Sequence, residues 1–487
     1  MVTRTKIVCT IGPASDSVVI LKKLVQAGMD VCRLNFSHGS HPDHRERFER
    51  IRSISDDIAV LVDLCGPKIR TGDIENGTVI KTGQTFRISG EIGLEGNSEV
   101  CSTNYPPLID DCNVGNHLAI DDGLLQLVVT KKLKSKKELV CKVTNGGPLK
   151  SRKGINAPDV PLSLYFPLEK DLEDIRFTIR KLDVDFIAAS FVRRKEDILK
   201  VRQILEERNS SIGIISKIEA RDALKNFNEI LAVSDGIMVA RGDLGVEIPG
   251  EQVPIVQKEL IAKCNSVGKP VIVATQMLDS MTNNPRPTRA EVSDVTNAII
   301  DGADAVMLSG ETAAGKYPVE TVEYMEKILK EINIHHYLVS KKIHKWTGEE
   351  TSIAEVLGQA THLISETKNL KIRAIVTSTR TGSTTRLIAK CRTEIPIIAG
   401  TPYKTLQRQL QLVWGVYPIQ VKVTPSYDEL LYEIVRNASE RDLLATKDTI
   451  LAVGGSLLGF PSKTNMIQIM KVEDVLLFGQ QLQKAAI

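Results

Sequence analysis

The sequence lacks the features that mark secreted, membrane-spanning or nucleic-acid-binding proteins. Its eight cysteines form no Cys-x-x-Cys pair and no metal-like spacing, which argues against a disulfide scaffold and for a reducing compartment. No uncharged apolar run approaches the roughly 20 residues of a membrane span, and the first residues lack the apolar stretch of a signal peptide. The net charge is only +3, from 63 basic and 60 acidic residues, so neither nucleic acid nor a membrane is expected as a partner. We expect a cytoplasmic protein.

A local excess of charge, the lysine run between Lys131 and Lys137, is interpreted as a solvated hairpin, with a polyanion site as the alternative. At 487 residues, with 42% hydrophobic and 25% charged residues, the chain is globular and long enough for two to four domains.

Short runs rich in Val, Ile and Ala recur along the chain, and longer amphipathic stretches follow many of them. Such runs are typical of parallel strands buried on both faces, and eight of them would close a (β/α)₈ barrel. The predicted strands are Lys6–Thr10, Val31–Asn35, Ala59–Asp63, Phe186–Ser190, Ile212–Ile218, Gly236–Ala240, Pro270–Thr275 and Ala305–Ser309.

Two further domains are predicted around this α/β barrel. The third and fourth strands lie too far apart for one helix, and short alternating segments with Asn-Gly and Asp-Gly turns fill the interval. After about His335 a new α/β pattern begins. We assign residues 1–66 and 163–335 to the barrel, 67–162 to an inserted small antiparallel β-barrel that acts as a lid, and 336–487 to an open C-terminal α/β domain. The segment 473–487 carries no functional prediction.

Charged residues follow the predicted strands at their C-terminal ends, where barrel enzymes keep their catalytic groups. Lys217 and Glu219 are two apart on one strand and share a face, and Asp243 follows the next strand among glycines. Two carboxylates at neighbouring strand ends suit a cation with oxygen ligands such as Mg²⁺. A structural Lys–Glu ion pair is the alternative for Lys217 and Glu219 considered alone.

Three other strand ends add polar groups to the same rim. Arg33, Asn35 and Ser37 share a face and suit an oxyanion or phosphate. The third strand end contributes Asp63, Lys68 and Arg70, and the seventh contributes Thr275. Each hydroxyl alone is read as a satisfied turn or cap, but their convergence on one rim favours a site.

Six motifs in order make the chain resemble the pyruvate kinase family from about Thr5 to Val472. They are Val31–Gly39, Ser216–Glu219, Met238–Glu247, Ala274–Met277, Pro285–Glu291 and Leu308–Pro318. The resemblance implies phosphoryl transfer from phosphoenolpyruvate to ADP, giving pyruvate and ATP in the last step of glycolysis. It also implies an allosteric homotetramer.

The resemblance also assigns roles to single residues. It implies that Glu219 and Asp243 hold Mg²⁺, and that a second Mg²⁺ arrives with the nucleotide. Lys217 and Arg33 would bind the phosphoryl group, Gly242 and Asp243 the substrate carboxylate, and Thr275 would relay a proton. The implied nucleotide contacts are Asn35, Phe36, Ser37, His38, Arg70 and Lys153.

The chain departs from the family pattern where many members bind K⁺. That region matches Asn35, Ser37 and Asp63, but Leu64 stands where the family usually has Thr, and Lys68 stands where it has Glu. We expect the Lys68 ammonium to replace the monovalent cation, so that K⁺ is not required. The alternative is that Lys68 faces solvent at the hinge of the inserted domain.

A loop rich in hydroxyls and glycine follows a strand of the last domain and resembles the family's effector loop. Converging amides and hydroxyls before a helix suit the phosphate of a phosphorylated small molecule, and Gly454–Asn465 is a candidate opposing wall. A plain strand–helix turn is the alternative. The loop residues are Thr379, Arg380, Thr381, Gly382, Ser383 and Thr384.

Two other classes of protein remain open on the residues alone. Metal-dependent aldolases and lyases also place carboxylates and Mg²⁺ at a barrel mouth, but they have no nucleotide for Arg33, Arg70 and Lys153 to hold. A non-catalytic effector-binding relative would be expected to lose Lys217 or a metal carboxylate, and the chain keeps them.

Overall fold

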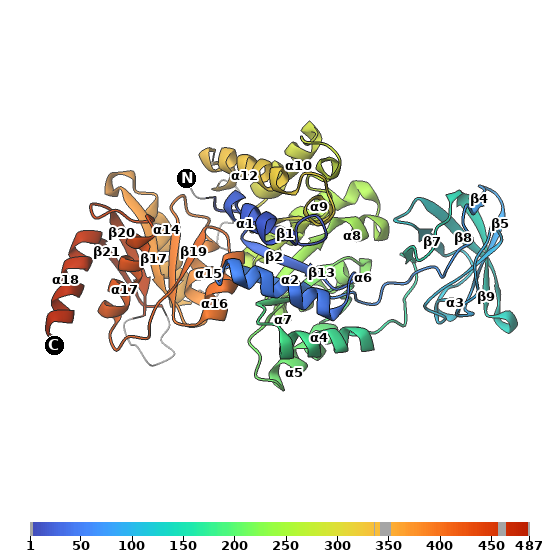
Figure 1. Cartoon of the computed structure of the whole chain (residues 1–487), viewed down its shortest axis with the longest axis horizontal. Helices are drawn as coiled ribbons and strands as arrows, with labels where there is room; N and C mark the ends of the chain where they lie inside the picture. The colour runs from blue at the N-terminus through green and yellow to red at the C-terminus, as the bar shows by residue number, and fades with distance from the viewer. Residues whose placement is uncertain (1–2, 336, 341–351, 456–463, 486–487) are drawn as a thin grey trace.

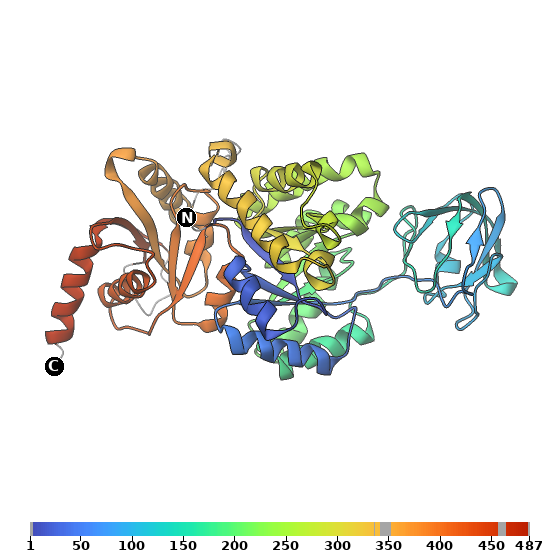
Figure 2. The ribbon, with the colours of Figure 1, turned by 45° about the horizontal axis from the view of Figure 1, so that its top comes forward.

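Three parts of the chain lie in a row in this computed structural model, which describes residues 3–335, 337–340, 352–455 and 464–485. A barrel stands in the middle, with the inserted β domain at one end and the C-terminal domain at the other (Figures 1 and 2). Two connecting segments join the inserted domain to the barrel (Figure 2). The predicted α/β architecture is confirmed.

The central part is a closed barrel of parallel strands in the order β1-β16-β15-β14-β13-β12-β3-β2. The strands are β1 (Lys6–Thr10), β2 (Val31–Asn35), β3 (Ala59–Asp63), β12 (Phe186–Ala189), β13 (Gly213–Ile218), β14 (Gly236–Ala240), β15 (Val271–Ala274) and β16 (Ala305–Leu308). The helices around it are α1 (Val18–Ala27), α2 (His41–Ile54), α4 (Glu169–Lys181), α5 (Lys195–Glu206), α6 (Arg221–Lys225), α7 (Phe227–Val233), α8 (Arg241–Glu247), α9 (Val253–Val267), α10 (Arg289–Ile300), α11 (Gly310–Ala313), α12 (Pro318–Ile334) and α13 (Tyr337–Ser340).

The barrel strands are apolar because both of their faces are buried. Residues such as Ile7 and Val60 point outward into the layer under the helices, while Val8 and Leu61 belong to the separate cluster that fills the barrel. Leu412 of the C-terminal domain joins this inner cluster and is fully buried. The C-terminal domain therefore packs against the end of the barrel where the strands begin, opposite the rim at their C-terminal ends.

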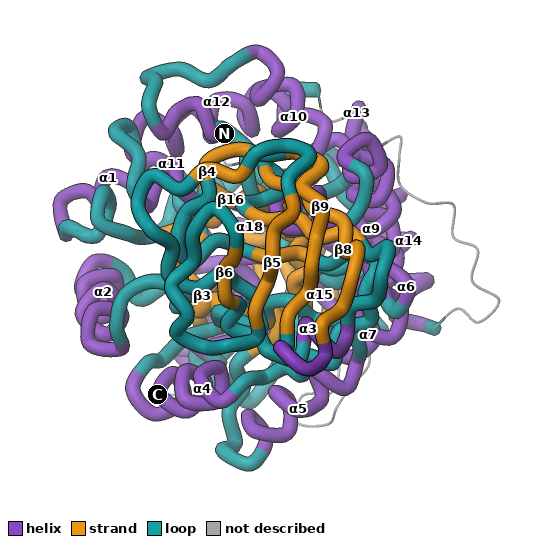
Figure 3. The backbone as a smooth tube through the Cα atoms, turned by 90° about the vertical axis from the view of Figure 1, so that its right-hand side faces the viewer, coloured by secondary structure: helices purple, strands orange, loops and turns teal. Residues whose placement is uncertain are grey.

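The inserted domain is built on a six-stranded sheet in the order β11-β7-β8-β9-β5-β6. Figure 3 shows β8, β9, β5 and β6 of this sheet side by side. Its pairs are antiparallel except for β5 and β6, which run parallel. The lysine run lies at the turn between β8 and β9, as predicted for a hairpin. Its elements are β4 (Val79–Ile80), β5 (Thr85–Ser89), β6 (Val100–Ser102), α3 (Leu108–Asp111), β7 (His117–Ile120), β8 (Leu125–Leu133), β9 (Glu138–Asn145), β10 (Gly147–Pro148) and β11 (Ile155–Asn156).

The C-terminal domain is a five-stranded sheet in the order β19-β18-β17-β20-β21. The edge strand β21 is antiparallel to β20 and was not predicted. The strands are β17 (Ile372–Ser378), β18 (Ile397–Thr401), β19 (Val416–Gln420), β20 (Thr449–Gly454) and β21 (Met466–Lys471). The helices are α14 (Ile353–Ser365), α15 (Ser383–Ala389), α16 (Lys404–Gln409), α17 (Tyr427–Glu440) and α18 (Val472–Ala485).

Buried ion pairs fix the C-terminal domain to the barrel. Arg408 Nε lies 2.6 Å from Asp185 Oδ1, just before β12, and Arg392 Nη1 lies 2.9 Å from Asp304 Oδ1, just before β16. Breaking such a pair from one side leaves a buried charge uncompensated and costs about 3–5 kcal/mol. Loss of one partner at this junction should therefore be strongly destabilising.

Within the described ranges, none of the helices is both long and apolar enough to cross a membrane. All eight cysteines are free thiols, and seven of them are buried.

Candidate active site

The residues expected at the rim lie at the C-terminal ends of the barrel strands, on the side of the inserted domain. Asn156 of that domain donates a hydrogen bond of 2.9 Å from Nδ2 to Glu247 Oε1 of α8, which follows β14. Arg221 of α6 lies 3.1 Å from Asp159, at the end of the insertion. These contacts set the inserted domain over the strand ends.

Asp63, at the end of β3, is the buried anionic centre of this rim, with 1% of its surface exposed. Arg33 of β2 donates from Nε to Asp63 Oδ2 at 2.7 Å, and its Nη1 donates to Thr10 Oγ1 at 2.8 Å. Burial alone would raise the pKa of Asp63, but Lys217 and Arg33 lower it below its usual value. Asp63 is therefore a fixed negative charge that orients two cations.

Lys217 of β13 is the second cation on Asp63. Its Nζ lies 3.2 Å from Asp63 Oδ1 and 3.0 Å from Glu219 Oε1, and it donates to Ser190 Oγ at 2.7 Å. Burial alone would lower the pKa of Lys217, but the carboxylates of Asp63 and Glu219 raise it above its ordinary value. The ammonium is therefore positively charged and held by three oxygen atoms.

Glu219 follows β13 directly and is 1% exposed. Its Oε2 accepts a hydrogen bond of 2.7 Å from the Phe191 amide. Burial raises the pKa of Glu219, Lys217 opposes this, and the charges of Asp243 and Asp63 add to it. A bound cation would offset the cost of burying this carboxylate beside two others, and carboxylate oxygens are the ligands that Mg²⁺ prefers. This donor set fits a divalent cation.

Asp243, the other expected metal ligand, lies in the first turn of α8 and is about one-quarter exposed. Lys68, on the segment that leads into the inserted domain, donates to Asp243 Oδ1 at 2.6 Å. The Lys68 ammonium also lies 5.6 Å from the centre of the Phe191 ring. Lys68 was expected beside Asn35, Ser37 and Asp63, but its partner is the carboxylate of Asp243. The Lys68 side chain is only 21% exposed.

Thr275, the residue after β15, has a left-handed backbone with φ of +72°. This conformation is strained for a β-branched residue. Its Oγ1 accepts from the Gly242 amide at 2.8 Å and lies 2.6 Å from the Ala274 carbonyl oxygen. The strained turn ties the end of β15 to the glycine that precedes Asp243.

The expected nucleotide residues form two groups. The first follows β2: the Ser37 amide donates to Asn35 Oδ1 at 3.1 Å, and the Phe36 ring stacks on His44 with 4.1 Å between ring centres. His38 lies in the same turn, and its carbonyl oxygen is 2.8 Å from His44 Nε2.

The second group of expected nucleotide residues belongs to the insertion. Arg70 donates from Nη1 to the Arg152 carbonyl oxygen at 3.1 Å. Lys153 Nζ lies 2.8 Å from Asp121 Oδ1 of the same domain. Both cations are thus bonded within the inserted domain.

The hydroxyl loop (Thr379–Thr384) lies between β17 and α15. The Gly382 amide donates to Thr379 Oγ1 at 2.8 Å, and Gly382 has φ of +83°. Arg380 donates to the Tyr403 hydroxyl at 3.0 Å, and the hydroxyls of Thr384 and Thr464 are 2.7 Å apart. Of the expected opposing wall, residues 456–463 lie outside the described residues.

Sequence reasoning did not single out Ser190, Thr10 or the Phe191 amide. Ser190 Oγ lies 3.1 Å from Asp63 Oδ1 and 2.7 Å from the Leu64 carbonyl oxygen, in addition to its contact with Lys217. Ser190 and Thr10 are the last residues of two predicted strands. Their position at strand ends could have identified them as site residues. The amide of Phe191, which has φ of +54°, could be located only in three dimensions.

Known proteins similar to this chain share its whole length. The family models described as pyruvate kinase, barrel domain, and pyruvate kinase, alpha/beta domain, match residues 2–322 and 359–470. A pyruvate kinase of Sporosarcina psychrophila is 47% identical over 490 residues, which is 99% of this chain and 82% of the relative. A pyruvate kinase of Staphylococcus aureus (strain MRSA252) is 47% identical over 489 residues, covering 99% of this chain and 83% of the relative.

Proposed function

The chain belongs to the pyruvate kinase family, and we propose that it transfers the phosphoryl group of phosphoenolpyruvate to ADP, giving pyruvate and ATP. Membership of this family makes the protein a phosphotransferase, which favours this reaction over the lyase and the non-catalytic alternatives. The reaction in this direction is the last step of glycolysis.

The observation that carries the proposal is the arrangement of Arg33 and Lys217 on the two oxygens of buried Asp63. Phosphoryl transfer needs positive charge fixed around oxygens on which negative charge spreads, and little covalent chemistry from the protein. Because Asp63 fixes both side chains, they keep their positions while the phosphoryl group moves. Arg33 binds that group, and Lys217 also stabilises the enolate that is left behind.

Glu219 and Asp243 are the proposed ligands of one Mg²⁺, and a second Mg²⁺ accompanies the nucleotide. The bound cation would neutralise negative charge on the carboxylate and phosphoryl oxygens of the substrate. The fit is supported by Glu219, whose buried carboxylate lies near those of Asp243 and Asp63. Asp243 must release the Lys68 ammonium, or share its carboxylate with it, to serve as a ligand.

The amides of Gly242 and Asp243 are proposed to bind the substrate carboxylate, because both belong to the first turn of α8. The Gly242 amide would exchange its hydrogen bond to Thr275 Oγ1 for this contact. Thr275 is the proposed proton relay to the enolate. Its hydroxyl lies beside the Gly242 amide and hence beside the bound substrate.

The inserted domain acts as a lid in this proposal. Asn35, Phe36, Ser37 and His38 on the barrel contact the nucleotide from one side, and Arg70 and Lys153 contact it from the lid. Water would otherwise accept the phosphoryl group, so the lid must exclude it during transfer. The Lys153–Asp121 ion pair is partly exposed, and exchanging it for a phosphate would cost little.

We propose that activity does not require K⁺. Leu64 offers no side-chain oxygen to a monovalent cation, and the Lys68 ammonium brings a permanent positive charge to the carboxylates of the rim. The side chain is mostly buried, which argues against the solvent-facing alternative.

Regulation is proposed to act through the C-terminal domain in a homotetramer. A phosphorylated small molecule would bind the hydroxyl loop, where the Gly382 turn precedes α15. Buried ion pairs such as Arg408–Asp185 connect this domain to the barrel.

Phosphorus NMR of phosphoenolpyruvate, ADP and MgCl₂ with the purified protein tests the reaction. We expect the phosphoenolpyruvate signal to decay as the γ-phosphate signal of ATP grows in equal amount. Release of inorganic phosphate without ATP, or no change with a folded protein, would contradict the proposal.

A further inference from the structure

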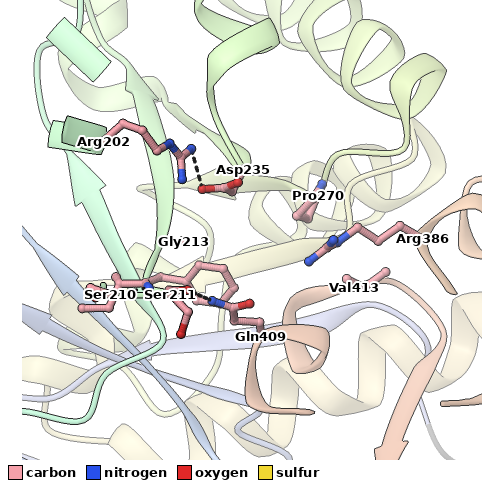
Figure 4. A pocket seen from close by; sticks show the side chains of 11 residues that line it. Arg202, Ser210, Ser211, Gly213, Asp235, Pro270, Arg386, Gln409 and Val413 are labelled. Atoms are coloured by element: carbon pink, nitrogen blue, oxygen red, sulfur yellow. Dashed lines mark hydrogen bonds and ion pairs between the residues drawn. The ribbon is translucent and has the colours of Figure 1, made fainter. Parts of the chain in front are cut away.

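A second charged pocket lies at the other end of the barrel, where the N-terminal ends of the strands meet the C-terminal domain (Figure 4). It consists of two adjoining cavities of about 110 and 360 Å³ that share Arg202, Asp235 and Arg386. We call the two together the interdomain pocket. We propose that it binds a small phosphate monoester, at a place separate from the phosphate site proposed for the hydroxyl loop.

The charge of the interdomain pocket is strongly one-sided. Among the described residues that line it, four are cations and one is an acid. The cations are Arg202, Lys269, Arg386 and Lys390, and the acid is Asp235. An excess of fixed positive charge in a concave site attracts a multiply charged anion.

The single carboxylate is already bonded within the barrel. Asp235 Oδ2 lies 2.8 Å from Arg202 Nη2 and accepts a hydrogen bond of 2.7 Å from the Ile214 amide. The charge of Asp235 is therefore offset by Arg202. Lys390 has a carboxylate partner of its own, Glu355 Oε1 at 3.7 Å. Among the described residues, Lys269 and Arg386 are thus the cations of the pocket that have no carboxylate within 4.0 Å.

Arg386 and Lys269 reach the pocket from opposite sides of the domain boundary. Arg386 extends from α15 into the space between Pro270 and Val413 (Figure 4). Its Nη1 donates to the Thr381 carbonyl oxygen at 3.1 Å, and within the described ranges no carboxylate lies within 4.0 Å of its guanidinium. Lys269, just before β15, donates to the carbonyl oxygens of Leu231 and Ala232 at 2.7 and 2.9 Å. Both cations thus bond to neutral carbonyl groups.

Burial lowers the pKa of both Arg386 and Lys269. Asp235 offsets part of this cost for both cations, and an anion bound between them would offset more of it. A phosphate group accepts several charge-assisted hydrogen bonds at once, from guanidinium and ammonium alike.

The shape of the pocket favours an ester over inorganic phosphate alone. The larger cavity, at about 360 Å³, is in the range of small-molecule sites. Ser210 and Ser211 provide hydroxyls in the smaller cavity for a polar substituent. Ser383, which the pocket shares with the hydroxyl loop, provides one in the larger cavity. Because the lining comes from both domains, a bound ester would bridge them.

Binding can be measured without catalysis, by isothermal titration and thermal unfolding of the full-length protein in a phosphate-free buffer. The probes are glycerol 3-phosphate and inorganic phosphate, with glycerol as the uncharged control. We expect glycerol 3-phosphate to bind and raise the unfolding midpoint, inorganic phosphate to bind more weakly, and glycerol to do neither.

Four variants separate the interdomain pocket from other phosphate sites. Lys269→Gln, in the barrel, and Arg386→Gln, in the C-terminal domain, should each raise the Kd about tenfold, as expected for one lost charge-assisted contact. Arg380→Gln weakens any binding at the hydroxyl loop and should leave the Kd of the interdomain pocket unchanged. Lys23→Gln on α1 should bind as the wild type does. Lys269→Gln keeps the proposal testable if Arg386→Gln does not fold.

Three results would overturn the proposal. They are no binding of glycerol 3-phosphate to the wild type, unchanged binding by the folded pocket variants, and loss of binding in Arg380→Gln alone. The last result would assign the ester to the hydroxyl loop. Unchanged binding by the pocket variants would assign it to another phosphate site, including the catalytic rim.

Discussion

The ammonium of Lys68 lies 2.6 Å from Oδ1 of Asp243, a residue 175 positions later in the chain. This ion pair joins the first segment of the insertion to a proposed metal ligand. Both side chains are about one-fifth to one-quarter exposed, so solvent screens the pair only in part. Positive charge is thereby supplied to the rim by the protein itself.

Wild-type activity should change less than about twofold when KCl replaces tetramethylammonium chloride. The Lys68 ammonium already supplies positive charge beside the carboxylates of the rim. In Lys68→Glu, the cation becomes an anion, and we expect activity to fall at least tenfold without K⁺ and to recover in part when K⁺ is added. Steady-state rates at constant ionic strength measure both effects. Strong K⁺ stimulation of the wild type would refute the substitution of Lys68 for a monovalent cation.

Lys217→Met should lower kcat by about 10³-fold, the size of effect seen when one fixed group that stabilises transition-state charge is removed. The loss follows from the removal of the only ammonium that contacts both Asp63 and Glu219 in the described structure. Lys181→Met, on the outer helix α4, is the matched control and should retain wild-type rates. A kcat within tenfold of wild type in Lys217→Met would remove Lys217 from the mechanism.

Glu219→Gln should abolish metal-dependent activity and yet stabilise the metal-free protein at alkaline pH. Burial raises the pKa of Glu219 from 4.5, its ordinary value, to about 7 in the folded protein. Between these two values the folded state binds more protons than the unfolded state. The wild type therefore loses stability as pH rises through that window, and the loss persists above it. Glutamine at position 219 carries no charge, so the variant does not lose this stability as pH rises.

Thermal unfolding in EDTA at several pH values measures this effect. The midpoint of Glu219→Gln should exceed that of the wild type at pH 8, and the difference should shrink as pH falls toward 5. If the wild type is more stable than Glu219→Gln at pH 8, the burial of the Glu219 charge does not destabilise the metal-free protein.

Thr275→Gly should separate stability from activity. Glycine removes the strain of the left-handed backbone, which is worth about 1–3 kcal/mol, but it also removes the hydroxyl bonded to Gly242. We expect a stability equal to or above that of the wild type, with kcat reduced at least tenfold. Thr275→Ser, which keeps the hydroxyl, should retain most activity, and equal loss in both variants would argue against a role for this hydroxyl.

The sequence predicted those site residues whose position follows from the strand in which they lie. Lys217 and Glu219 were found because residues two apart on a strand share a face, and the strand end was visible as the end of an apolar run. Arg33 was found in the same way. The resemblance to the pyruvate kinase family, confirmed by the comparisons, rested on the order of such strand ends.

Contacts between distant segments could not be predicted. The bond between Lys68 and Asp243 depends on how the inserted domain leaves the barrel, and the interdomain pocket depends on how α15 meets the strand that follows Lys269. The parallel pairing of β6 with β5 and the edge strand β21 were missed because short strands carry a weak periodic signal.

The most direct test of the site is the rate of ADP-dependent pyruvate formation from phosphoenolpyruvate, titrated with MgCl₂, for the wild type, Lys217→Met and Glu219→Gln. We predict saturable, Mg²⁺-dependent turnover by the wild type and less than about 1% of it in either variant, each shown to be folded by circular dichroism. Absence of turnover in the folded wild type, or turnover in both variants within twofold of it, would contradict the assignment of these residues.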